Sequence, residues 1–261
     1  MNNQYIENYY NTYNEDERLT SRHGNIEFLT TMKYIHDYTQ IGDKILDVGA
    51  GTGRYSIPLS REGYDVTALE LVAHNLEVLK SKLTPSDSLS TLQGNALVLS
   101  RFNDETFDAV LVFGPMYHLY SKDDKLNVLN EAKRVTKKNG HLFIAYCLNE
   151  ATLIQWAFNG NGQNMLDCLQ NHMLTPDYQC ISKPIDLFEM VRIEDIDSLN
   201  TKSNLTRLKL IGTDLFSCYI REQMNDWSEE AYKAYIAYHL SICERKDLIG
   251  ISNHVLDLLV K

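Results

Sequence analysis

Three glycines at alternate positions follow a short apolar run in the segment ILDVGAGTG. Gly49, Gly51 and Gly53 separate that run from the beginning of an expected helix. A glycine-rich turn between a strand and a helix lets backbone N–H groups approach an anionic or polar ligand, and the helix dipole adds to the attraction. The segment therefore predicts a nucleotide-binding loop.

The residues around this loop favour one class of nucleotide over another. The dinucleotide fingerprint is G-x-G-x-x-G, with an acidic residue about 20 positions later. Arg54 stands here in the place of the third glycine of that fingerprint. Asp47 ends the apolar run, where its carboxylate would repel a pyrophosphate but attract an ammonium or a sulfonium group. The spacing therefore favours S-adenosylmethionine over a nicotinamide cofactor.

Strands and helices alternate over about the next 100 residues, and this indicates an α/β fold. Expected strands lie at 44–48, 64–71, 89–97, 106–119, 141–149, 204–214 and 252–261. Expected helices lie at 30–43, 53–63, 73–83, 122–140 and 222–247. The pattern predicts a doubly wound, Rossmann-like, mostly parallel seven-stranded sheet with helices on both faces. Ligands in such sheets lie beyond the carboxyl ends of the strands. The loops that should converge on one site are 48–54, 70–73, 94–97 and 113–118.

The whole chain is expected to form a single domain with a helical cap inserted after the fifth strand. Its segments are an N-terminal helical segment (1–43), a cofactor-binding core (44–149), a cap insert (150–203) and the final strands and helices (204–261). Together with the helices at 213–250, the insert would form a lid over the sheet edge. Trp156, Phe158 and Met165 could line an apolar acceptor chamber, although helix-spaced apolar residues also form ordinary cores.

The segment ILDVGAGTG resembles motif I of the class I S-adenosylmethionine-dependent methyltransferases, and the resemblance covers residues 40–148. It implies that Glu70 accepts hydrogen bonds from both ribose hydroxyls, since two acceptor oxygens match two vicinal donors. Asn95 takes the place of the family's usual aspartate near the adenine. The cofactor-binding residues that the resemblance implies are Asp47, Gly49, Gly51, Gly53, Glu70, Leu71, Asn95, Ala96, Phe113 and Gly114.

The segment FGPMYHLY, residues 113–120, is the best candidate wall of an acceptor pocket. It resembles the motif IV region of small-molecule methyltransferases and lacks the (D/N/S)-P-P-(Y/F) pattern of DNA amino-methylases. His118 is a candidate catalytic base with a near-neutral pKa, and Tyr117 could position a substrate. Alternatively, His118 bonds to a neighbouring loop and Tyr117 seals the cofactor pocket. Methyl transfer from a sulfonium demands no covalent step of the protein, so no catalytic triad is expected.

Aromatic residues recur at helical spacing near the N-terminus. Tyr5, Tyr9 and Tyr13 share one face of an expected helix. In related methyltransferases an N-terminal helix often closes over the cofactor, so Tyr13 could reach its carboxylate. Arg22 is a second candidate, because a guanidinium forks onto a carboxylate. The alternatives are that the tyrosines belong to the core and that Arg22 is a surface charge.

Composition excludes several classes of protein. The net charge is −10, and the densest basic stretch is AKRVTKK (132–138), so no nucleic-acid partner is expected. No apolar run approaches the roughly 20 residues of a membrane-spanning helix. The five cysteines are odd in number and form no CxxC pair. They predict reduced thiols, a cytoplasmic location and no metal site.

We therefore expect a cytoplasmic methyltransferase that uses S-adenosylmethionine to methylate an O, N or S atom of a small molecule. One alternative is a non-catalytic protein or sensor that binds the same cofactor. Arg54 argues against an oxidoreductase. A methyltransferase that acts on a protein is a weaker alternative. A cavity beside the methyl group would favour the enzyme, and a pocket filled by cap side chains would favour the binding protein. The sequence does not indicate an oligomeric state.

Overall fold

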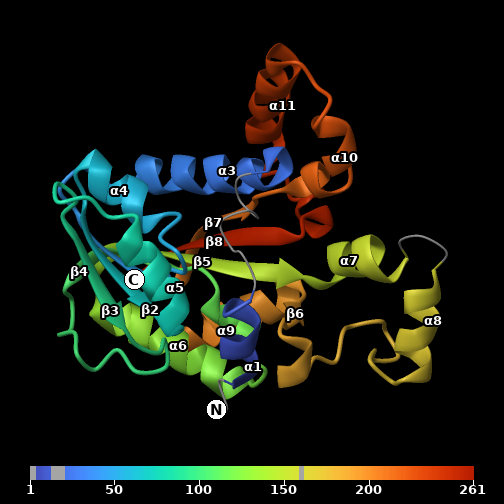
Figure 1. Cartoon of the computed structure of the whole chain (residues 1–261). Helices are drawn as coiled ribbons and strands as arrows, with labels where there is room; N and C mark the ends of the chain where they lie inside the picture. The colour runs from blue at the N-terminus through green and yellow to red at the C-terminus, as the bar shows by residue number, and fades with distance from the viewer. Residues whose placement is uncertain (1–3, 13–20, 159–161) are drawn as a thin grey trace.

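A single mixed sheet forms the centre of the computed structural model, which describes residues 4–12, 21–158 and 162–261 (Figure 1). Its order among the described residues is β3-β2-β1-β4-β5-β8-β7, and an eighth strand, β6, pairs with β5 outside this path. The strands are β1 Lys44–Val48, β2 Asp65–Glu70, β3 Leu89–Gln93, β4 Phe107–Val112, β5 Thr136–Leu148, β6 Met190–Val191, β7 Thr206–Gly212 and β8 His254–Val260. Only β8 is antiparallel to its neighbours, β5 and β7. The predicted α/β sheet is confirmed, but the two residues of β6 were too few to leave a periodic signal.

Helices cover both faces of the sheet. They are α1 Gln4–Tyr10, α3 Arg22–Tyr38, α4 Ser56–Glu62, α5 Ala73–Ser81, α6 Lys122–Val135, α7 Asn149–Thr152, α8 Gln163–Gln170, α9 Ile193–Ser203, α10 Arg221–Met224 and α11 Glu229–Ile242. In β4, Val110 and Val112 belong to the core shared with α6 and α9. Ala109 and Leu111 belong to the core shared with α3 and α4. Successive strand residues point to opposite faces, so a strand covered on both sides is apolar throughout.

The boundary between α6 and β5 differs from the prediction. The helix begins at Ser121, whose hydroxyl accepts a hydrogen bond from the Asp124 N–H, and ends at Val135. Gly140 therefore lies inside β5 and does not cap the helix. A Cβ atom on Gly140 would stand 2.7 Å from the Asp108 carbonyl oxygen. The close approach of β4 and β5 explains the glycine.

The insert is shorter than predicted. The helix α9 packs with α6 against the main core, so only α7 to β6 project from the end of the sheet (Figure 1). Trp156 and Phe158 are each 53% exposed. Met165 packs in a small satellite core with Leu153 and Ala157. No helix in the described part of the chain is long and apolar enough to span a membrane.

Candidate functional site

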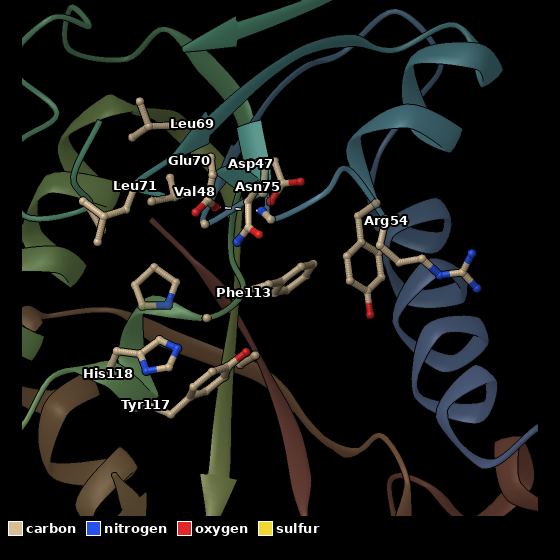
Figure 2. Close-up of a pocket in the computed structure, with 18 of the residues that line it drawn as sticks. Asp47, Val48, Arg54, Leu69, Glu70, Leu71, Asn75, Phe113, Tyr117 and His118 are labelled. Atoms are coloured by element: carbon tan, nitrogen blue, oxygen red, sulfur yellow. Dashed lines mark hydrogen bonds between the residues drawn. The ribbon is translucent and has the colours of Figure 1, made fainter. Parts of the chain in front are cut away.

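A cavity opens beyond the carboxyl ends of β1, β2 and β4, where the four predicted loops converge (Figure 2). Its volume is about 140 Å³. A single water needs only about 10–15 Å³ by the same measure, so the cavity suits a ligand of many atoms. Eleven residues expected to bind cofactor or acceptor line it, namely Asp47, Gly49, Gly51, Glu70, Leu71, Asn95, Ala96, Phe113, Gly114, Tyr117 and His118.

The Glu70 carboxylate is held rigidly at the end of β2. Its Oε2 accepts a hydrogen bond from the Gly51 N–H at 2.8 Å, and its Oε1 accepts one from the Val72 N–H at 2.8 Å. The residue is only 4% exposed. A carboxylate has about four acceptor positions. The arrangement therefore suits a ligand that presents two neighbouring hydroxyl donors.

Asp47 places a second buried carboxylate beside Glu70 (Figure 2). Its Oδ2 accepts a hydrogen bond from the Ser56 hydroxyl, but its buried Oδ1 has no hydrogen-bond partner within the described parts of the chain. Burial raises the pKa of Asp47 to about 7, the bond from Ser56 opposes this shift, and the charge of Glu70 adds to it. A buried carboxylate oxygen without a partner is unfavourable. A cationic ligand group would satisfy it.

The raised pKa of Asp47 predicts a pH-dependent affinity for cationic ligands. The ionised fraction rises from about one tenth at pH 6 to about three quarters at pH 7.5 when the pKa is about 7. A ligand cation prefers the ionised form, so affinity should rise by up to about eightfold over this interval. In the ligand-free protein the same group contributes stability below pH 3.8, and that contribution is lost as the pH rises through 7.

Calorimetric titration of S-adenosylhomocysteine, which carries an ammonium group, at pH 6, 6.5, 7 and 7.5 measures this effect. The Asp47→Asn variant serves as the control, because it should bind weakly with no such slope. An affinity that is flat in the wild-type protein, or a slope that persists in the variant, would contradict the assignment.

A glycine is required at each of the three loop positions for a different structural reason. Gly49 has φ +85°, and a Cβ there would stand 2.6 Å from the Phe113 carbonyl oxygen. Gly51 has φ +54°, and no heavy atom lies within 4 Å of its Cβ position. Gly53 does not line the cavity. It packs instead against the side chains of Ile57 and Leu79, which a Cβ at this position would meet at 2.8–2.9 Å. Its expected cofactor contact is therefore replaced by a packing role.

The two N-terminal candidates, Tyr13 and Arg22, have different outcomes. Tyr13 lies outside the described residues. The Arg22 guanidinium donates to the carbonyls of Met224 and Trp227, at 3.1 and 2.6 Å, and pairs with Glu229. Arg22 therefore ties α3 to the C-terminal helices and does not line the cavity.

Other residues line the cavity where the tyrosine face of the N-terminal helix and Arg22 were expected to do so. Tyr5 is exposed, whereas Ile6 and Tyr10, on an adjacent face of α1, line the cavity. The cavity-lining arginine is Arg54, whose guanidinium carbon lies 3.9 Å from the centroid of the Phe28 ring. The sequence reasoning used Arg54 only as an argument against a dinucleotide.

His118 uses both ring nitrogens inside the protein. Its Nδ1–H donates to the Leu187 carbonyl at 2.8 Å, and the Tyr10 hydroxyl lies 3.0 Å from Nε2. Burial lowers the pKa of His118, and the bond to Leu187 opposes this shift. The ring is therefore neutral near pH 7, and its Nε2 accepts from Tyr10. Tyr117 packs edge-on against His118, with ring centroids 5.0 Å apart (Figure 2).

The side of the cavity away from Glu70 contains residues that no motif indicated. Glu27, Thr31, Thr213 and His254 line it. By contrast, none of the described residues of the insert lines the cavity, so the structure does not support the alternative in which Trp156, Phe158 and Met165 line an acceptor chamber. Besides the predicted loops and the residues next to them, the cavity is lined from α1, α3, α5, β5, the segment after β7 and the beginning of β8.

Comparison with known proteins gives similarities of sequence and of fold. A family profile described as "Methyltransferase domain" matches residues 46–144. A ubiquinone biosynthesis O-methyltransferase of Vibrio cholerae is 26% identical over 151 residues, 58% of this chain and 59% of that protein. A demethylmenaquinone methyltransferase of Lysinibacillus sphaericus is 37% identical over 114 residues, 42% of this chain and 46% of that protein. The chain therefore spans less than two thirds of the length of these relatives.

A solved structure from Thermotoga maritima matches nearly the whole chain. It is described as a SAM-dependent methyltransferase, possible histamine N-methyltransferase, and is 19% identical. The match covers 99% of each chain with a TM-score of 0.60. At this identity the likeness shows the fold alone.

Proposed function

We propose that this chain is a class I S-adenosylmethionine-dependent methyltransferase that methylates an oxygen, nitrogen or sulfur atom of a small molecule by in-line displacement. The observation that carries the proposal is the buried Oδ1 of Asp47, which has no hydrogen-bond partner in the described residues and lines the cavity. It suits a ligand with a cationic group and opposes a pyrophosphate. The adjacent Glu70 suits the hydroxyls of a ribose.

The residues of the chain have binding and positioning roles in this reaction. Bound S-adenosylmethionine supplies a methyl group already activated on a sulfonium. We assign Asp47, Gly49 and Gly51 to the methionine end of the cofactor, with Phe113 and Gly114 beside them. Glu70, Leu71, Asn95 and Ala96 are assigned to its adenosine end. What remains for the protein is to align the acceptor and to exclude water.

The extent of the cavity supports an enzyme over a binding protein. It continues from Leu71 and Asn95 to Glu27 and His254, and no described side chain of the insert fills it. Space therefore remains for an acceptor beside the cofactor. The names of the matched relatives, which concern quinone biosynthesis, support a small-molecule acceptor. The five free cysteines support a cytoplasmic location.

An acceptor that arrives protonated needs a base. We propose that His118 serves as this base through Tyr10, because the Tyr10 hydroxyl lies 3.0 Å from Nε2 and both residues line the cavity. His118 is then a positioning residue, and Tyr10 is the group that meets the ligand. Tyr117 forms the adjoining wall.

Turnover distinguishes the enzyme from the binding protein. The purified chain is incubated with methyl-labelled S-adenosylmethionine and a panel of small phenols, thiols and amines, and S-adenosylhomocysteine is measured. We expect acceptor-dependent product from at least one class. Cofactor binding without product from any class would favour the non-catalytic alternative.

A further inference from the structure

Three ionisable residues from distant parts of the chain meet at the end of the cavity formed by β8. Glu27 comes from α3, Asp214 follows β7, and His254 begins β8. In the sheet, β1, β4 and β5 separate β8 from β2, the strand that ends at Glu70. Four strand spacings correspond to about 19 Å. This end of the cavity is therefore remote from the proposed adenosine site.

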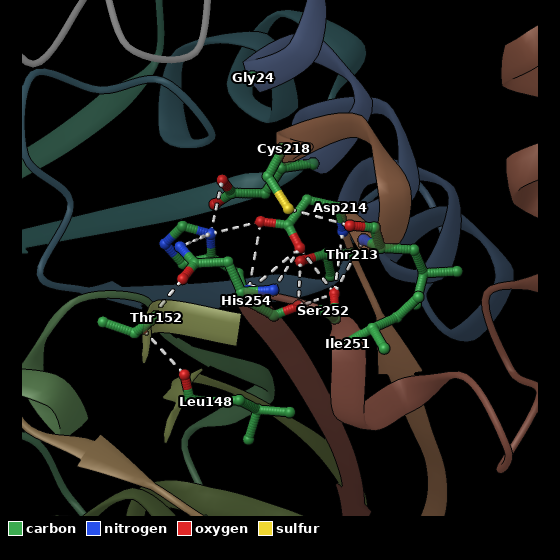
Figure 3. Close-up of polar contacts among 12 residues, drawn as sticks. Gly24, Leu148, Thr152, Thr213, Asp214, Cys218, Ile251, Ser252 and His254 are labelled. Carbon is green, nitrogen blue, oxygen red and sulfur yellow. Dashed lines mark hydrogen bonds and ion pairs between the residues drawn. The ribbon is translucent and has the colours of Figure 1, made fainter. Parts of the chain in front are cut away.

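Asp214 is a buried carboxylate that orients His254. Its Oδ1 accepts hydrogen bonds from the Ser252 hydroxyl at 2.7 Å and the Asn253 N–H at 2.8 Å. Its Oδ2 accepts from Nδ1 of His254 at 2.8 Å (Figure 3). Burial raises the pKa of Asp214, but the bonds from His254 and Ser252 outweigh it and hold that pKa below its ordinary value. The carboxylate is ionised and the imidazole ring is fixed.

Glu27 brings a second carboxylate to the same imidazole. Its Oε2 lies 3.5 Å from Nδ1 of His254, and Glu27 lines the cavity. Burial lowers the pKa of His254, but the charge of Glu27 and the side-chain hydrogen bonds to Asp214 and Cys147 raise it well above its ordinary value. Two carboxylates thus face one imidazolium, which leaves a net charge of −1 on the cluster.

The rest of the described cavity wall offers little positive charge to balance this negative charge. Among the described residues, Arg54 is the one lysine or arginine that lines the cavity, and it lies over Phe28 in the α3 and α4 layer. An anionic acceptor placed against Glu27 would meet like charge, which costs several kcal/mol at a desolvated contact. The aromatic walls formed by Tyr10 and Tyr117 favour cations.

We propose that Glu27, supported by the Asp214–His254 pair, binds a positively charged nitrogen of the acceptor, so that the acceptor is a small basic amine. The inference rests on the proposed function and deepens it, because it names the substrate class. Glu27 touches the amine. Asp214 and His254 are positioning residues: the Asp214 carboxylate offsets the charge of the imidazolium, and His254 lies against the Glu27 carboxylate.

Three probes of matched shape test the charge preference. With the protein saturated by S-adenosylhomocysteine, 2-phenylethylamine, 2-phenylethanol and phenylacetate are titrated in a calorimeter. The amine is expected to bind at least about tenfold more tightly than the alcohol, because its ammonium adds charge attraction to the hydrogen bond that either probe can donate to the Glu27 carboxylate. The carboxylate should bind more weakly than both.

Two variants locate the preference at Glu27. The Glu27→Gln variant should keep its affinity for S-adenosylhomocysteine and lose most of the preference for the amine. Glu62→Gln removes the same charge from an exposed pair with His36 and should retain that preference. Equal binding of the amine and the alcohol, no binding of the amine, or a preference that survives Glu27→Gln would each overturn the proposal.

A divalent cation is the rival occupant, because the ligand atoms of the three residues all lie within 4.8 Å of one another. Titration with MgCl2 and ZnCl2 distinguishes it. A metal that binds wild type but not Glu27→Gln, with no preference for the amine, would replace the amine subsite by a metal site. Failure of the wild-type protein to bind S-adenosylhomocysteine would instead count against the proposed function itself.

Discussion

Replacing Glu70 by glutamine is expected to weaken the binding of S-adenosylmethionine and S-adenosylhomocysteine by about 100-fold. The substitution turns one acceptor oxygen into a donor, which then faces the N–H of Gly51 or Val72. It also removes a charge-assisted bond to the ribose, and losses of about 3 kcal/mol correspond to that factor. Calorimetric titration of both ligands measures the change.

A matched variant separates this effect from general damage. Glu131 is also a carboxylate that accepts a backbone bond, from the Leu99 N–H at 2.9 Å, and it pairs with Arg134 outside the cavity. Glu131→Gln should lower the melting temperature and leave cofactor affinity unchanged. Equal affinities for the Glu70→Gln and wild-type proteins would remove Glu70 from the site.

Replacing Gly51 by alanine is expected to weaken cofactor binding by about 30-fold in a protein that still folds. The added methyl would clash with no heavy atom of the described residues, because none lies within 4 Å of the Cβ position, and Gly51 lines the cavity. The methyl would therefore enter space assigned to the cofactor, and such overpacking costs about 1–3 kcal/mol. Calorimetry on the folded variant gives the affinity.

Gly42 provides the control for backbone strain. It has φ +94°, and its Cβ position is likewise clear of heavy atoms, but it lies between α3 and β1 outside the cavity. An alanine in the left-handed region costs about 1–2 kcal/mol at either position. Gly42→Ala should lose stability without losing affinity. If both variants bind as wild type does, the loop does not cradle the cofactor.

The core of the site was predictable because its signals are local. Asp47, Gly49 and Gly51 lie within five residues of one another, and the end of the following strand identifies Glu70. A parallel sheet then brings such strand ends to one edge. Residue type, spacing and the general geometry of α/β sheets were sufficient there.

The remaining parts depend on contacts between distant segments. Arg22 bonds to Met224 and Trp227, about 200 positions away, and nothing near Arg22 in the sequence indicates these partners. The sequence around Gly140 predicts a helix cap, and only the packing of β4 against β5 shows why a glycine is needed there. The tyrosine spacing identified a helix correctly but not which of its faces meets the cavity.

The cluster at β8 was missed for the same reason. Glu27, Asp214 and His254 have no common motif, and the pairing of β8 with β7 together with the packing of α3 against the segment after β7 brings them together. The two-residue strand β6 and the shortened insert likewise depend on tertiary packing rather than on periodicity.

Calorimetric titration of the wild-type protein with S-adenosylmethionine, S-adenosylhomocysteine and NAD tests the central claim most directly. Two observations predict micromolar binding of the first two ligands and no binding of NAD: the buried Asp47 Oδ1 has no hydrogen-bond partner among the described residues, and backbone N–H groups hold Glu70. Binding of NAD alone would contradict the account, because a pyrophosphate would then lie beside two buried carboxylates.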